Sequence, residues 1–212
     1  MNSKHEERKD FITNSLLKTY TAEEVSVEEF ETFNTKDAVV WIDPLDGTSD
    51  FVKKNLPAVT VLIGLSINGN SRLGVVHNPF KKDDEKNSIT YYATAEHGAY
   101  SLDYHNSMTI EETLKRTPTY LEPFDHFEEP AANKEIKVAA SLQHSSSQMV
   151  EILNLIAPVE ICKIGGAGNK CNNLAIGNVD CYIHPSPGLK FWDLCAPESI
   201  IKAMGGYSTD LA

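Results

Sequence analysis

The sequence predicts a mixed fold in which an α+β part is followed by an α/β part. Two observations carry this prediction. Strand-like runs at residues 59–67 and 72–78 flank Asn68-Gly69-Asn70, a typical hairpin signal. Beyond residue 135, strand-like runs alternate with segments whose apolar residues recur at helical spacing. We therefore expect two parts, 1–134 with an antiparallel sheet and 135–212 with an α/β layer.

The first part is expected to consist mainly of strands. Residues 11–20 are expected to form a short helix, and residues 23–33 a loop or a poor helix. Residues 38–42 (AVVWI) are β-branched and apolar on both faces, which favours a buried strand that ends at the following DPLDGTSDF stretch. Two more strands are expected at 88–94 and 99–102, around the turn His97-Gly98.

The second part is introduced by a change in composition. Residues 108–134 are rich in Pro, Glu and Thr, which is typical of a linker or a surface excursion. After them the expected strands and helices alternate. The strands are expected at 136–141, 159–164 and 179–184, and the helices at 148–157, 170–176 and 193–204.

The charge balance limits the kind of partner. Acidic residues outnumber basic residues by 30 to 19, which gives a formal net charge of −11. This balance argues against a broad surface for a nucleic-acid polymer, which needs clustered Lys and Arg. An acidic protein that binds an anionic substrate needs local positive charge, and a bound metal cation can supply it.

The composition also bears on location. No segment approaches the roughly 18 apolar residues of a membrane span, and the N-terminus MNSKHEERKD does not have the apolar core of a signal peptide. The four cysteines form no CxxC pair, and we interpret them as buried, reduced thiols. These features predict a cytoplasmic protein that does not bind a membrane.

The most informative segment is Asp43-Pro44-Leu45-Asp46-Gly47-Thr48, at the exit of the strand expected at 38–42. Its two carboxylates can converge on one point, and carboxylate and carbonyl oxygens are the ligands that Mg²⁺ prefers. The helix that Thr48 is expected to start offers free backbone N–H groups to a phosphate. The alternative interpretation is an Asx-turn with a helix cap.

Three further segments carry polar or glycine-rich chemistry. Asp193, after Trp192, is either a third carboxylate of the same cluster or a helix N-cap. Gly165-Gly166-Ala167-Gly168-Asn169-Lys170 lets backbone amides approach an anion, with Lys170 as a point charge, or is only a turn. The Ser-rich segment 141–147, which contains His144, either holds a phosphate or base or caps a helix.

In combination, these segments resemble a known family. DPLDGT, followed far downstream by WDLCAPE, resembles the two signature motifs of the inositol monophosphatase superfamily. GGAGNK, SPGLKFWDLCAPE and the Ser141/His144 segment are most similar to the 3′(2′),5′-bisphosphate nucleotidases within it. The resemblance covers about residues 38–211. It implies a layered αβαβα sandwich and a Mg²⁺-dependent, lithium-sensitive phosphomonoesterase.

The resemblance assigns a role to individual residues. Asp43, Asp46 and Asp193 are implied to be metal ligands through their carboxylates, and Leu45 through its backbone carbonyl, around roughly two or three Mg²⁺ ions. Asp43 and Thr48 are the implied catalytic residues. The resemblance implies that the Thr48 hydroxyl helps to orient the attacking water. The implied substrate-binding residues are Gly47 and Thr48, whose amides face the scissile phosphate, and Ser141, His144, Gly166 and Lys170, which hold the nucleotide product.

The implied reaction removes the 3′-phosphate of adenosine 3′,5′-bisphosphate and yields AMP. Lys170 would then recognise the phosphate that is not cleaved. Two alternatives remain: an inositol (poly)phosphate phosphatase of the same fold, or a truncated relative that binds nucleotide or a partner without catalysis. Replacing Asp46 or Asp193 by alanine is expected to abolish most turnover and leave the fold intact, since the cluster is like-charged.

The sequence departs from the family pattern at both ends. The family has a further metal-ligand glutamate in a Gly-Glu-Glu type motif upstream of DPLDGT, and no GEE string occurs here. Glu6-Glu7 is at a suitable distance, but no apolar strand precedes it. The family also continues beyond the position of Ala212. The chain is therefore expected to be a shortened form, with a weaker Mg²⁺ site if one carboxylate is missing.

Overall fold

The computed structural model describes residues 33–81, 86–94, 96–124, 136–141, 147–157 and 160–210. Residues 35–212 form one compact unit, and residues 1–34 form another. The helix expected at 11–20 and nearly all of the loop expected at 23–33 lie outside the described residues. The larger unit begins with a 3₁₀ turn, η2 (Thr35–Asp37).

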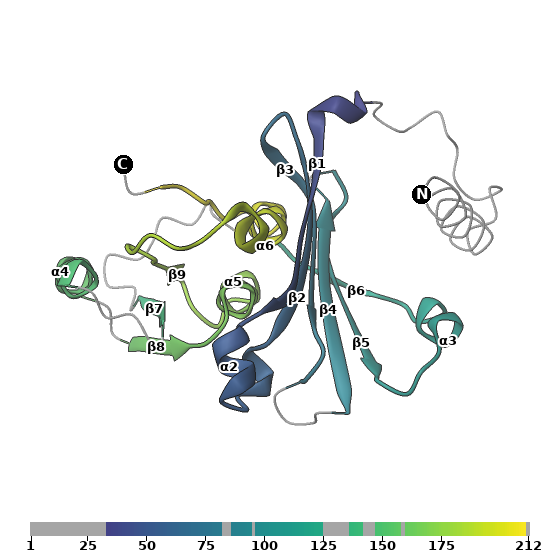
Figure 1. Cartoon of the computed structure of the whole chain (residues 1–212), viewed down its shortest axis with the longest axis horizontal. Helices are drawn as coiled ribbons and strands as arrows, with labels where there is room; N and C mark the ends of the chain where they lie inside the picture. Colours follow the sequence, from purple (N-terminus) through teal and green to yellow (C-terminus); the bar gives the residue numbers. More distant parts are fainter. Residues whose placement is uncertain are drawn as a thin grey trace, which may run out of the picture. The chain divides into compact units, whose positions relative to one another are not determined.

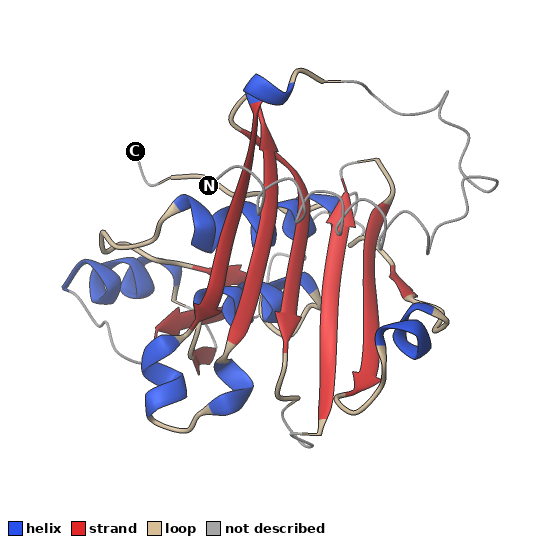
Figure 2. Cartoon of the chain, turned by 45° about the vertical axis from the view of Figure 1, so that its right-hand side comes forward, coloured by secondary structure: helices blue, strands red, loops and turns tan. Residues whose placement is uncertain are grey.

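The larger sheet of this unit is antiparallel, with six strands paired in chain order (Figure 2). Its strands are β1 (Ala38–Asp46), β2 (Thr60–Ile67), β3 (Asn70–Asn78), β4 (Asn87–Thr94), β5 (Gly98–His105) and β6 (Thr119–Leu121). The predicted hairpin is confirmed, because β2 and β3 pair on either side of Asn68 and Gly69. Both turn residues have positive φ, 51° and 77°, as a tight hairpin turn demands.

Strand β1 differs from its prediction in length and in burial. It continues through Pro44 to Asp46, with a register shift against β2 between Asp43 and Asp46. Because β1 is an edge strand, Pro44 is tolerated there. Val40 and Ile42 are 59% and 58% exposed, so the strand is not buried on both faces as its apolar run suggested.

Residues 108–134 were expected to be a linker or a surface excursion. Their first half is not a plain linker, because it contains α3 (Ile110–Leu114) and β6. The helix starts at a capping box. The Thr109 hydroxyl accepts from the Glu112 N–H, and the Glu112 carboxylate accepts from the Thr109 N–H. Strand β6 then pairs with β5. Residues 125–135 lie outside the described residues.

The second sheet is parallel, in the order β8-β7-β9. Its strands are β7 (Lys137–Ser141), β8 (Glu160–Ile164) and β9 (Cys181–Tyr182), and they alternate with α4 (Ser147–Ile156), α5 (Ala167–Ala175) and α6 (Phe191–Ala203). The predicted alternation is therefore confirmed. Strand β9 is shorter than expected, and α5 begins three residues before Lys170, inside the glycine-rich segment.

These elements stack as layers, which confirms the expected layered sandwich. Figure 1 shows α5 and α6 between the two sheets, with α4 on the far side of the smaller sheet. The short α2 (Thr48–Val52) and η3 (Leu56–Ala58) connect β1 to β2. The division of the chain at residue 134 stays a prediction: the two sheets fall on either side of it, within one compact unit. Among the described helices, none has the length and apolar character that a membrane crossing requires.

Helix α6 lies very close to the larger sheet because the strands beneath it carry small residues. Gly64, Gly74, Ala93 and Ala99 are neighbours in register across β2 to β5. A Cβ at Gly74 would lie 2.0 Å from the Ala196 carbonyl oxygen, and one at Gly64 would lie 2.7 Å from the Ala196 nitrogen. The helix backbone therefore touches the strand backbone, with no room for a side chain between them.

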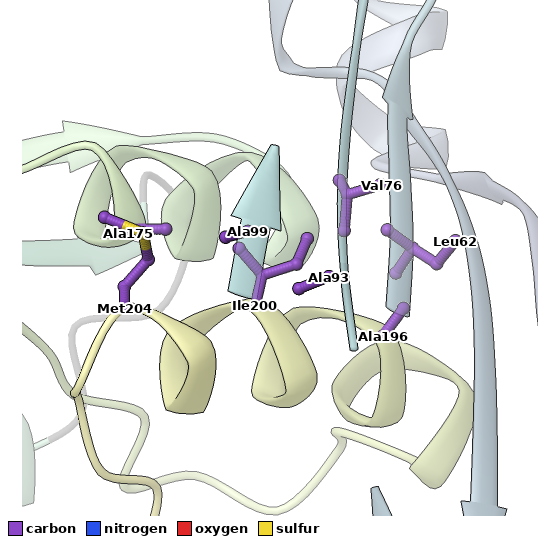
Figure 3. Packing of buried hydrophobic residues seen from close by; sticks show 8 residues of the cluster. All are labelled: Leu62, Val76, Ala93, Ala99, Ala175, Ala196, Ile200 and Met204. Carbon is purple, nitrogen blue, oxygen red and sulfur yellow. The ribbon is translucent and has the colours of Figure 1, made fainter. Parts of the chain in front are cut away.

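The core fills the space around this contact. Figure 3 shows Ala196 and Ile200 of α6, and Met204 directly after the helix, beside residues of the sheet and of α5. The larger members, Leu62, Val76 and Ile200, are at most 1% exposed, and burial of each contributes about 1.5–3 kcal/mol to folding. The core thus fixes α6, and with it the position of the helix's first turn.

Replacing Gly74 by alanine tests this close packing. The added Cβ must displace α6, and overpacking of this kind costs about 1–3 kcal/mol. The free energy of unfolding in urea is expected to fall by that amount. Ile63→Val, on the opposite face of β2 and 39% exposed, is the control and should change stability by less than about 0.5 kcal/mol. Equal stability of the two variants would contradict the close approach.

Candidate functional site

The structure brings three carboxylates together. Asp43 and Asp46 lie at the end of β1, and Asp193 lies in the first turn of α6. One oxygen of each side chain lies within 4.8 Å of the others. Asp46 is buried, and the other two are half-buried. Two segments far apart in the sequence therefore converge on one point, as the sequence analysis expected.

The turn after β1 combines both interpretations made for it. The Leu45 N–H donates to Asp43 Oδ1 at 3.0 Å, an Asx-type bond, and the Thr48 hydroxyl donates to the Leu45 carbonyl at 3.0 Å. Gly47 has φ 80° and ψ 32°, a left-handed conformation that glycine adopts without strain. The Leu45 carbonyl oxygen keeps a second lone pair for another partner. The turn is thus a tight local structure that also presents oxygen atoms.

Asp46 is held by the start of α5. Its Oδ1 accepts from the Ala167 N–H at 3.1 Å, and its Oδ2 accepts from the Gly168 N–H at 2.8 Å and from the Thr60 hydroxyl at 2.7 Å. These two amides were expected to approach an anion. The anion that they bind is a carboxylate of the protein, placed at the positive end of the helix.

The glycines of this segment are required by close packing. A Cβ at Gly166, where φ is 67°, would lie 2.2 Å from the Ala58 carbonyl oxygen. A Cβ at Gly168 would lie 2.5 Å from the Thr60 hydroxyl. The absence of side chains lets the start of α5 approach the β1–β2 connection closely enough for its amides to reach Asp46.

Asp193 is both a helix-terminal acceptor and a member of the cluster. Its Oδ2 accepts from the Lys190 N–H at 2.6 Å. Burial raises the pKa of Asp193, and the negative charges of Asp46 and Asp43 raise it further, against the opposing effect of the Lys190 bond. Gathering these charges is unfavourable without a cation. Three carboxylates with a nearby carbonyl form an all-oxygen donor set, which fits Mg²⁺.

Lys170 lies on α5, with 5% of its surface exposed. Its ammonium donates to the Gly166 carbonyl at 2.8 Å and to the Ile164 carbonyl at 3.4 Å, and lies 5.2 Å from the ring centroid of Tyr182. Burial lowers the pKa of Lys170, while the charges of Asp46, Cys171 and Asp50 oppose that shift. By donating to these two carbonyls, the Lys170 ammonium stabilises the glycine-rich turn.

A cavity of about 520 Å³ opens beside the carboxylates, a size typical of small-molecule sites. Most of the residues singled out in the sequence line it: Asp46, Gly47, Thr48, Ser141, Gly166, Lys170 and Asp193. Asp43 and Leu45 are not among its lining residues. His144 lies outside the described residues.

Four residues at or beside the cavity were not expected from the sequence. Asp50 on α2 is 5% exposed and accepts from the Asn55 side-chain amide at 2.8 Å. Tyr182 and His184 line the same cavity, with their ring centroids 6.2 Å apart. Thr60 lies directly behind Asp46. Only Thr60 had a usable signal, since it shares the inward face of β2 with Leu62.

Comparison with known proteins gives a family match over nearly the whole chain. The model of the inositol monophosphatase family matches residues 5–212. Human 3′(2′),5′-bisphosphate nucleotidase 1 is 32% identical over 187 residues, which cover 86% of this chain and 53% of that protein. The human Golgi-resident adenosine 3′,5′-bisphosphate 3′-phosphatase is 29% identical over 186 residues, covering 84% and 43%.

A solved structure agrees in fold. CysQ from Bacteroides thetaiotaomicron, described as a bacterial member of the inositol monophosphatase family, superposes with a TM-score of 0.63 at 25% identity. The match covers 93% of this chain and 72% of that one. The chain spans about half the length of the nucleotidase that it resembles.

The sequence analysis expected the alanine variant of Asp46 to keep its fold. The three hydrogen bonds that Asp46 accepts predict instead that this variant is destabilised. Asp46→Ala leaves the Thr60 hydroxyl and two amides at the start of α5 without their acceptor, and each buried unpaired group costs about 1–3 kcal/mol. Asp193→Ala removes one bond and relieves repulsion. In urea unfolding with EDTA, Asp46→Ala is expected to be strongly destabilised and Asp193→Ala close to the unsubstituted chain. Equal stability of the two variants would show that the bonds of Asp46 contribute little.

Proposed function

We propose that this chain, which belongs to the inositol monophosphatase family, is a Mg²⁺-dependent phosphomonoesterase that converts adenosine 3′,5′-bisphosphate to AMP and inorganic phosphate. The observation that carries the proposal is the meeting of Asp43, Asp46 and Asp193 at the edge of a ligand-sized cavity. The names of the similar nucleotidases support this choice of substrate.

The carboxylates of Asp43, Asp46 and Asp193, with the Leu45 carbonyl, would hold roughly two or three Mg²⁺ ions. Bound Mg²⁺ supplies positive charge to the phosphate and activates a water. The protein's own contribution is placement. The Thr48 hydroxyl, which donates to the Leu45 carbonyl, keeps lone pairs that would accept from the attacking water, and Asp43 would act from the end of β1.

The rest of the substrate would lie along the cavity. All five implied substrate-binding residues that the structure describes line this cavity. Gly47 and Thr48 would face the phosphate that is removed, and Ser141, Gly166 and Lys170 would hold the nucleotide. The Lys170 ammonium has three N–H groups, and its bonds to described residues go to two carbonyls, so a third N–H would be available to a phosphate. Tyr182 and His184, which also line the cavity, would supply aromatic surface to an adenine.

The experiment compares substrates under one set of conditions. Phosphate release by the full chain is measured for adenosine 3′,5′-bisphosphate, inositol 1-phosphate and inositol 1,4-bisphosphate, each with Mg²⁺ and with EDTA. The proposal expects Mg²⁺-dependent release, fastest from the nucleotide. Preference for an inositol phosphate would move the substrate to the alternative within the family. Nucleotide binding without release would support the non-catalytic alternative.

Asp193→Asn tests the role of the third carboxylate. Loss of a partner that only orients a metal ligand already costs about 10–100-fold, so loss of a ligand charge should lower kcat/KM by at least about 100-fold. Because the amide keeps the side chain's size and its acceptor for the Lys190 N–H, the circular dichroism spectrum should be unchanged. Glu160→Gln, a surface change on β8, is the control. Retained activity in Asp193→Asn would contradict the metal assignment.

The same proposal covers the remaining expectations. We also expect inhibition by Li⁺ and a cytoplasmic location. We expect small phosphate-bearing ligands to be the only class of substrate. One similar human protein is Golgi-resident by name, so microscopy of a fluorescent fusion is needed to decide the location.

A further inference from the structure

Thr60, at the start of β2, lies directly behind the carboxylate cluster. It pairs with Asp46 across the β1–β2 ladder and has no exposed surface. Its hydroxyl donates to Asp46 Oδ2 at 2.7 Å, a short charge-assisted bond. The other two donors to Asp46 are backbone amides of α5. Thr60 is thus the side-chain donor among the described partners of this carboxylate.

Counting acceptor positions shows what this bond does. An ionised carboxylate has about four lone-pair positions, two on each oxygen. The Gly168 N–H and the Thr60 hydroxyl occupy both positions of Oδ2, while the Ala167 N–H occupies one position of Oδ1. Among the donors that the described residues supply, one position remains, and it is on Oδ1. Asp46 therefore has a single oxygen available for a cation.

We propose that Thr60 is a positioning residue that makes Asp46 a one-oxygen ligand and thereby favours Mg²⁺ over Ca²⁺. This inference rests on the proposed function. Mg²⁺ requires near-octahedral geometry at about 2.0–2.1 Å, to which a carboxylate usually gives one oxygen, whereas Ca²⁺ accepts two-oxygen carboxylates at about 2.3–2.6 Å. Removing the hydroxyl frees Oδ2 and lets the carboxylate turn toward the larger ion.

The packing around the hydroxyl holds it in place. A Cβ at Gly168 would lie 2.5 Å from Thr60 Oγ1 and 3.2 Å from Asp46 Oδ2. Leu62, the next inward residue of β2, would lie 2.6 Å from the same Cβ. The hydroxyl, the carboxylate and the glycine therefore fit together as one unit, and a freely rotating Thr60 side chain is not compatible with it.

The test uses two substitutions at Thr60 that differ in the hydroxyl. Thr60→Val keeps the shape and removes the hydroxyl, and Thr60→Ser keeps the hydroxyl. Thr119→Val, at an exposed position of β6, is the matched control. For each full-length chain, freed of metal, the thermal unfolding midpoint is followed while MgCl₂ or CaCl₂ is added. The half-saturating concentrations give the preference between the ions, without a substrate and independently of turnover.

The expected result is a change in selectivity. Thr60→Val should raise the half-saturating Mg²⁺ concentration by about 10–100-fold and raise that of Ca²⁺ much less, while Thr60→Ser and Thr119→Val keep the original ratio. A Thr60→Val chain with the original ratio would overturn the role of Thr60. A Thr60→Ser chain that loses the preference for Mg²⁺ over Ca²⁺ would also overturn the role of Thr60. This second variant keeps the test decisive if the valine variant does not fold. Absence of any Mg²⁺ effect in the unsubstituted chain would refute the metal site, and both proposals with it.

Discussion

The contact between the backbone of α6 and the backbones of β2 and β3 is the constraint on which the site depends. Gly64 and Gly74 leave no side chain where Ala196 passes, so the backbone of α6 packs directly against the strands. Asp193 is three residues before Ala196 on the same helix. Any side chain beneath Ala196 would lift the start of α6 and withdraw Asp193 from the end of β1. The small residues of the sheet are therefore as necessary to the carboxylate cluster as the carboxylates themselves.

Asp43, Asp46 and Asp193 bring three negative charges close together in a protein that is already acidic, so they repel one another. Asp46 is partly relieved by the amides at the start of α5, which act as a fixed positive end of a helix. Asp193 has less relief, since burial and its two neighbours raise its pKa and only one backbone bond opposes them. Lys170 adds a positive charge near Asp46, but among the described residues its ammonium bonds to carbonyls rather than to a carboxylate. A divalent cation completes the balance that the protein leaves open.

Much of the fold and the site could be predicted from the sequence, for identifiable reasons. The hairpin at Asn68-Gly69 and the alternation after residue 135 follow local rules, and the DPLDGT and WDLCAPE motifs identified the three carboxylates. Other features depend on tertiary contacts. The apolar run of β1 gave no sign that the strand lies at an edge, and the role of the glycines at 166 and 168 depends on Ala58 and Thr60, more than a hundred residues away. Asp50, Tyr182 and His184 reach the cavity by packing alone.

The bond between Asp46 and the Ala167 amide joins residues 121 positions apart. The six-stranded meander can assemble by pairing neighbours, but this bond requires the chain to return from its last third, and contacts of such long range form slowly because of the loop that they close. The carboxylate oxygens of the cluster are therefore expected to reach their final arrangement late in folding. An ion that binds only the completed cluster would shift the folding equilibrium toward the native chain. Ion binding would therefore report that the end of β1 and the start of α5 have come together.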